Sequence, residues 1–89
     1  MTDEYSWDEN KRSKTLKERG LDFAEMDSFD WDNALTLEDH DSDSGETRFI
    51  SIGWLINTLV VAVWCSRDET TRIISLRRAS RRERKLYEQ

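Results

Sequence analysis

The sequence has no proline, three glycines, one cysteine and one histidine in 89 residues. The single cysteine, Cys65, cannot form an internal disulfide, and its apolar neighbours predict a small buried hydrophobic residue. The single histidine, His40, excludes an acid-base ribonuclease with two catalytic histidines and leaves no zinc site with Cys65. Phosphate-binding glycine loops, nucleophile elbows and paired-carboxylate motifs are absent as well.

Long apolar segments are also missing. The longest apolar stretch, residues 52–65, is interrupted by polar residues and is shorter than the roughly 20 residues that cross a bilayer. Residues 1–10 are acidic and lack the basic start and apolar centre of a signal peptide. We therefore expect one small domain over residues 1–89, located in the cytoplasm without a membrane partner, with residues 1–6 disordered.

Charge is abundant and divided along the chain. Residues 1–46 contain 15 acidic and 5 basic residues, whereas residues 47–89 contain 4 acidic and 9 basic residues, against a total net charge of −5. A cationic half can attract phosphate even when the whole molecule is acidic, because the field depends on where charge lies. Two solvated faces without a ligand would give the same pattern.

The amino-terminal part of the chain predicts two helices. Residues 8–19 contain no glycine or proline and end before Gly20, which is typical of a helix C-terminus. A second, shorter helix is predicted after Asp22, because Asp22 and Glu25 form a capping-box pattern. Its apolar residues, Phe23, Met26 and Phe29, are expected in the core.

Four strands and a final helix are predicted after residue 34. Residues 34–38, 47–54, 59–65 and 70–77 are rich in β-branched and aromatic residues, and their short connections favour antiparallel neighbours. Residues 59–64 lack alternation, as expected of a central strand. The capping-box pattern of Ser80 and Glu83 begins the final helix and explains Ser80 better than a kinase site does. The predicted fold class is α+β: two helices, a four-stranded antiparallel sheet and a C-terminal helix.

The acidic loop at residues 39–45 is similar to the start of a calcium-binding EF-hand. Gly45 falls one position late, however, and Ile50 occupies the position of the bidentate glutamate. We therefore expect a solvated loop, no metal site and no cofactor.

Arginine is the remaining residue type with chemistry to offer. It is concentrated on the last two predicted strands and the last helix, and it binds phosphate bidentately while staying charged. Alternation places Arg72 and Arg77 on opposite faces of an ideal strand. Both can reach one phosphate only if Arg77 lies past the strand end, where the chain turns toward the Ser80 cap.

The linear order of residues resembles the BrnT family of ribonuclease toxins. The matching residues are Trp7-Asp8-Glu9, Lys11, Leu16, Gly20-Leu21, Phe23, Phe29-Asp30, Ala34-Leu35-Thr36-Leu37, Gly45-Glu46, Arg48, Ile52-Gly53, Arg72-Ile73-Ile74-Ser75, Arg77-Arg78-Ala79-Ser80, Glu83-Arg84 and Tyr87. The resemblance implies a fold similar to RelE-type messenger-RNA interferases, RNA cleavage without metal, and neutralisation by an antitoxin of the BrnA type in a hetero-oligomer.

Such cleavage needs cations at the phosphate and groups that move protons. On this basis Arg48, Arg72 and Arg77 are expected to neutralise the phosphate, and Glu46 or Lys11 to transfer protons. Further RNA contacts are expected from Arg78, Arg82 and Trp7. Trp7 could stack on a base or could equally pin the first helix to the sheet.

The chain departs from the family pattern at several positions. Glu18-Arg19-Gly20 replaces Lys-His-Gly, Thr15 replaces asparagine, Asn33 replaces proline and Leu76 replaces a small residue. These departures support an alternative hypothesis. In it, the chain is a weakened or inactive toxin-fold module that binds an antitoxin and takes part in transcriptional autoregulation.

Overall fold

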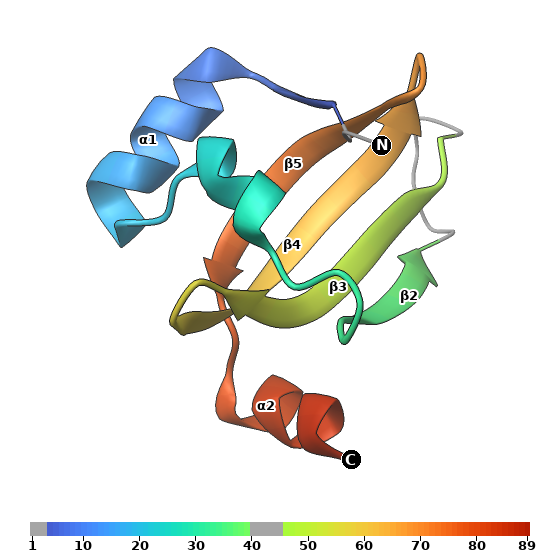
Figure 1. Ribbon diagram of the computed structural model, residues 1–89. Helices are drawn as coiled ribbons and strands as arrows, with labels where there is room; N and C mark the ends of the chain where they lie inside the picture. Colours follow the sequence, from blue (N-terminus) through green and yellow to red (C-terminus); the bar gives the residue numbers. More distant parts are fainter. Residues whose placement is uncertain (1–3, 40–45) are drawn as a thin grey trace.

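The computed structural model describes residues 4–39 and 46–89 (Figure 1). Residues 40–45 of the acidic loop, including His40, lie outside these ranges, as do residues 1–3. The elements are, in chain order, β1 (Tyr5–Trp7), α1 (Glu9–Arg19), the 3₁₀ helix η1 (Phe23–Ser28), β2 (Leu35–Asp39), β3 (Arg48–Leu55), β4 (Thr58–Arg67), β5 (Thr70–Arg78) and α2 (Arg81–Glu88).

The sheet has five strands in the order β1-β5-β4-β3-β2 and is mixed, because β1 runs parallel to β5. The prediction of a four-stranded antiparallel sheet is therefore wrong. Three residues are too few to show the alternation that identifies a strand, and the partner of Tyr5, Thr71, lies far along the chain. Tyr5 and Ser6 belong to β1, so the disorder expected for residues 1–6 does not extend to them.

Helix α1 confirms the first predicted helix. Asp8 caps its N-terminus, because the Asp8 carboxylate accepts a hydrogen bond from the backbone N–H of Asn10 at 2.9 Å. Gly20 ends the helix in the left-handed conformation, with φ of 70°. None of the α1 residues is buried, so the helix lies on the surface and leaves its polar side chains available for contacts with the sheet edge.

The second predicted helix is a 3₁₀ helix, η1, so the prediction of two N-terminal α-helices is wrong. Its backbone hydrogen bonds join residues that are three apart in the sequence, from Glu25 N to Asp22 O at 3.0 Å and from Phe29 N to Met26 O at 3.1 Å. Six residues are too few for a stable run of α-helical bonds, and burial of the apolar side chains decides the conformation. Phe23, Met26 and Phe29 are buried, as predicted.

The sheet separates two apolar clusters. Helices α1 and η1 lie on one side of the sheet, and α2 follows the end of β5 below the sheet (Figure 1). The larger cluster joins η1 to Val60, Ala62, Ile73 and Leu76. On the other face, which we call the α2 face, Ile52, Leu59 and Val61 form a smaller cluster with Tyr87 of α2. Strand β4 contributes buried residues to both clusters, as expected of a central strand.

Helix α2 begins at a complete capping box. The Ser80 hydroxyl accepts a hydrogen bond from the Glu83 backbone N–H at 3.2 Å, and the Glu83 carboxylate accepts one from the Ser80 backbone N–H at 2.8 Å. This confirms Ser80 as the cap. None of the α2 residues is buried, so the helix depends on its termini and on a few side chains for its place on the sheet.

We expect Ser80→Ala to lower the free energy of unfolding by about 1 kcal/mol, because the substitution removes the side-chain acceptor of the helix cap. Thermal unfolding followed by circular dichroism measures this change. Ser13→Ala, at an exposed position within α1, is the control and should leave the melting temperature nearly unchanged. An unchanged melting temperature in Ser80→Ala would contradict the assignment of the cap.

Candidate active site on the open sheet face

Strand β5 contains one residue more than β4 along the pairing between them. Val63 pairs with Ser75 and Trp64 pairs with Ile73, which leaves Ile74 without a partner. This β-bulge shifts the alternation of β5 by one residue. Arg72 therefore pairs with Cys65, and Arg77 pairs with Val61, four residues away on β4. Both arginines lie on the α2 face.

The prediction that Arg77 must leave the strand to join Arg72 is thus wrong. Arg77 lies within β5, and the bulge places the two side chains on one face. Their partners on β4 are four residues apart, which corresponds to roughly 13 Å along the strand. The two arginines therefore share a surface, and their spacing suits phosphates two nucleotides apart on one strand.

Arg48 lies level with Arg72 on the same face. Phe49 pairs with Trp64, so the preceding residue of β3, Arg48, adjoins Cys65, whose partner on the other side is Arg72. Arg48 and Arg72 are thus two strands apart, roughly 10 Å between backbones. Long guanidinium side chains can converge across this distance on one anion above the small Cys65 side chain.

Cys65 and Arg48 are both affected by burial. Cys65 is fully buried, and burial raises the pKa of its thiol, so it is the inert hydrophobic residue that the sequence predicts. The Arg48 Nε is buried and has no hydrogen-bond partner among the described residues. Arg48 therefore keeps a donor that an incoming oxygen could take after the side chain rotates.

Glu46 lies just before β3 and is held by Arg67. The Arg67 guanidinium donates hydrogen bonds to the Glu46 carboxylate at 2.9, 3.1 and 3.3 Å. These bonds hold the pKa of Glu46 below its usual value, with a smaller contribution from the charge of Arg48. The carboxylate is therefore near the arginines and ionised, but it is a weaker base than a free glutamate.

Arg77 is bound to the capping box of α2. Its guanidinium donates to the two carboxylate oxygens of Glu83 at 2.8 and 2.6 Å and to the Arg78 carbonyl at 3.3 Å. These bonds hold the pKa of Glu83 down at about 2. The Nε and one hydrogen of Nη2 take no acceptor among the described residues, so the side edge of the guanidinium remains open.

The other predicted RNA contacts are distributed more widely. The Arg78 side chain turns back to donate to the Arg19 carbonyl at 2.9 Å, which ties the end of α1 to β5. Arg82 is exposed on α2. Trp7 packs against the larger core cluster, and its Nε1 donates to Glu9 at 3.1 Å. This geometry is the one expected if Trp7 pins α1 to the sheet.

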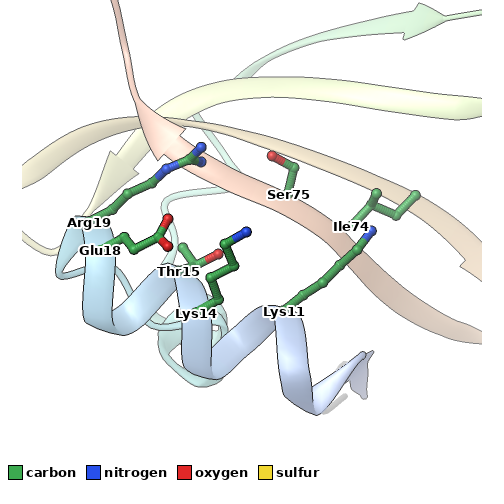
Figure 2. Close-up of a pocket in the computed structure, with 7 residues that line it drawn as sticks. All are labelled: Lys11, Lys14, Thr15, Glu18, Arg19, Ile74 and Ser75. Carbon is green, nitrogen blue, oxygen red and sulfur yellow. The ribbon is translucent and has the colours of Figure 1, made fainter.

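Lys11 lies apart from the arginines, in a groove between α1 and the edge of β5. The close-up in Figure 2 shows its side chain extending from α1 toward Ile74. Sequence reasoning included Lys11 but missed the groove and its second lysine, Lys14. The spacing of Lys11, Lys14 and Glu18 on one face of the helix is the signal that could have found it.

Other kinds of site find no support in the described residues. Residues 4–39 and 46–89 hold no group of three or more His, Cys, Asp or Glu side chains suited to binding a metal ion. Over the same ranges, none of the helices has the length and apolar character that a membrane crossing requires.

Comparison with known proteins identifies a family. A family-wide sequence model described as "Ribonuclease toxin, BrnT, of type II toxin-antitoxin system" matches residues 7–83. The match begins at the last residue of β1 and ends in the capping box of α2, so it includes the bulge at Ile74 as well as Arg72 and Arg77. No curated protein matches the chain.

The Arg77–Glu83 pair predicts an acid-sensitive contribution to stability. Since folding lowers the pKa of Glu83 from 4.5 to about 2, the pair stabilises the fold above about pH 4.5, and this is lost as the pH falls toward 2. Arg77 is 45% exposed, so solvent screening reduces the effect to roughly 1 kcal/mol.

Glu83→Gln should accordingly lower the melting temperature at pH 7 and have a smaller effect near pH 2.5, where wild-type Glu83 is partly protonated. Glu88→Gln removes the same charge from the same helix and serves as the control. A difference between wild type and Glu83→Gln that stays constant across this pH range would contradict the pairing.

Proposed function

The chain belongs to the BrnT family of ribonuclease toxins of type II toxin-antitoxin systems, and we propose that it cleaves RNA without metal on the open part of its α2 face. The observation that carries this proposal is the bulge at Ile74, which aligns Arg72 with Arg77 on one face and beside Arg48. Three arginines on one face of the sheet, two of them partly exposed and Arg77 exposed, suit an extended polyanion.

The proposed reaction uses the nucleophile already present in RNA. The ribose 2′-oxygen attacks the adjacent phosphorus and loses its proton to a base. The bond from phosphorus to the 5′-oxygen breaks, and that oxygen takes up a proton. A 2′,3′-cyclic phosphate and a 5′-hydroxyl result. Negative charge increases on the phosphoryl oxygens in the transition state, where fixed cations lower the barrier most.

Arg48 and Arg72 are the residues we assign to that charge. They flank Cys65 from the two neighbouring strands and have no ion pair among the described residues, so their charge is available to a ligand. Arg77 is held by Glu83 and would grip a phosphate through the open side edge of its guanidinium. Arg78 and Arg82 would add charge at the end of β5 and on α2.

Proton transfer is assigned to Glu46 or Lys11. Glu46 lies close enough to Arg48 for their charges to interact, so it can approach a phosphate held there. The hydrogen bonds from Arg67 make it a weaker base than a free glutamate. Lys11 lies on the β5 edge rather than above Cys65, so it fits better as a donor or as a phosphate contact.

The family implies an antitoxin partner, which we propose to be of the BrnA type and to bind in the cytoplasm, where messenger RNA is found. Exposed apolar residues on β2, in the turn between β3 and β4 and on α2 support such a complex, with Leu37 48%, Ile56 61% and Leu86 42% exposed. Acidic segments of the partner would cover the arginines of the α2 face and block RNA.

A second candidate is an inactive module that keeps the fold and the partner and acts in transcriptional autoregulation. The sequence departures at Glu18-Arg19, Thr15, Asn33 and Leu76 favour it. Expression of the chain alone separates the two candidates, because growth arrest requires the enzyme, whereas complex formation with the product of a neighbouring gene is expected of both.

Arg72→Ala should abolish growth arrest in cells that express the chain. Removal of a cation that acts mainly on the transition state costs roughly 3–4 kcal/mol, or a hundredfold to thousandfold in rate. Arg77→Ala should reduce the rate less, because Glu83 already compensates part of the Arg77 charge. The measurement is colony formation on induction, together with cleavage of labelled RNA by purified protein.

Arg84→Ala is the matched control for this pair. Arg84 belongs to α2, and its guanidinium carbon lies 5.5 Å from the centre of the Trp54 ring on β3. The Arg84→Ala substitution should therefore change stability more than cleavage. Circular dichroism confirms that each variant folds. Full toxicity in both Arg72→Ala and Arg77→Ala would reject the site.

A further inference from the structure

A groove runs between α1 and the edge of β5, beyond the point where β1 stops pairing with that strand. Its volume is about 310 Å³, at the lower end of the roughly 300–1,000 Å³ typical of small-molecule sites. Figure 2 shows Lys11 and Lys14 reaching from α1 toward β5. The lining residues are Lys11, Lys14, Thr15, Glu18, Arg19, Ile74 and Ser75.

The two lysines of this groove form no ion pair with the described residues of the protein. Arg12, on the same helix, is paired with Glu9 at 2.6 Å and with Asp22 at 2.7 Å. Lys11 and Lys14 have no ion pair with any described residue, although the chain contains 19 acidic residues. Two ammonium groups directed into one groove repel each other, and an anion between them would relieve the repulsion.

The groove also has a fixed frame. The Arg19 guanidinium donates to the Leu76 carbonyl at 3.0 Å, and Arg78 donates to the Arg19 carbonyl at 2.9 Å. These two bonds cross between α1 and β5 in opposite directions and hold the C-terminal end of the helix against the strand. The lysines are therefore presented by a helix whose distance from β5 is set by side-chain hydrogen bonds.

The position of the groove connects it to the proposed cleavage site. Ile74 and Ser75 line it, and they lie between Arg72 and Arg77 in the chain. Arg72 is two residues from Ile74, roughly 7 Å along the strand, which is close to the spacing of successive phosphates in single-stranded RNA. A strand bound at Arg72 can thus continue over the β5 edge into the groove.

The mixed lining favours a nucleotide over a bare anion. Besides the two ammonium groups, the groove offers the Glu18 carboxylate, the hydroxyls of Thr15 and Ser75, and the apolar Ile74 side chain. A carboxylate repels a free phosphate but accepts hydrogen bonds from ribose hydroxyls and base N–H groups. The Ile74 side chain supplies an apolar surface for a base or sugar.

We propose that the groove formed by Lys11, Lys14, Glu18 and Ile74 is a subsite for the nucleotide adjacent to the cleaved bond in single-stranded RNA. The two lysines bind its phosphate, and Glu18 and Ser75 contact its sugar or base. This inference rests on the proposed ribonuclease function, and it assigns Lys14 and Glu18 to substrate binding.

Binding of a 2′-O-methyl RNA oligomer tests the subsite separately from cleavage, because this RNA lacks the 2′-hydroxyl nucleophile. Fluorescence anisotropy is measured at several salt concentrations. Each lysine that contacts a phosphate of a single strand contributes about 0.7 to the slope of log K against log salt concentration. Lys14→Ala should therefore lower the slope by about 0.7 and weaken binding about fourfold at 0.15 M salt.

Lys17→Ala is the matched control. It removes the same charge from the same helix, but Lys17 does not line the groove. Its slope and affinity should stay near those of the wild type. Equal effects of the two substitutions, or no effect of Lys14→Ala, would overturn the subsite. A loss of antitoxin affinity without a loss of RNA affinity in Lys14→Ala would overturn it in favour of a protein contact.

Cleavage of ordinary RNA by the wild type separates failure of the subsite from failure of the proposed function. Cleavage without a selective Lys14 effect rejects the subsite alone. A selective Lys14 effect on binding without any cleavage rejects the ribonuclease function and leaves the groove as a binding site for single-stranded RNA. An absence of RNA binding by the wild type rejects both.

Discussion

Burial of Ile73 and Leu76 on the same side of β5 is the constraint on which the rest of the site depends. Both side chains belong to the larger core cluster, at 1% and 0% exposure, yet they are three residues apart. A regular strand would direct them to opposite faces. Burying one such side chain contributes about 1.5–3 kcal/mol, whereas one disturbed ladder hydrogen bond costs about 0.5–1.5 kcal/mol. The bulge at Ile74 is the outcome.

The same bulge arranges the charges on the opposite face. Because it shifts the alternation once, it moves Arg77 to the side of Arg72 while it moves Leu76 into the core. The packing requirement of one face thereby sets the chemistry of the other. If β5 held the same residues without a bulge, Arg72 and Arg77 would lie on opposite faces, and either Ile73 or Leu76 would leave the core face.

Within residues 4–39 and 46–89, some basic side chains form ion pairs, and others do not. Asp22 holds Arg12, Glu46 holds Arg67 and Glu83 holds Arg77. Among the described residues, Arg48, Arg72, Lys11 and Lys14 make no such pair, and these residues surround the exposed part of β5. The acidic total charge of the chain thus coexists with a local cationic surface. Helix α2 borders that surface without burying any of its own residues, so the capping box and Arg77 link its position to the site.

The sequence by itself determined the elements whose signals are local. Gly20 identified the end of the first α-helix and the Ser80 capping box identified the start of the last one, and the apolar run of β4 identified the central strand. It also identified the arginines, since residue type alone gives their affinity for phosphate. The tertiary structure decided which of these side chains meet. β1 depends on a parallel partner that is distant in the chain. η1 depends on burial of its apolar side chains against the sheet. The common face of Arg72 and Arg77 depends on a bulge that core packing requires. These features arise from contacts between distant segments, and periodicity within one segment does not record them.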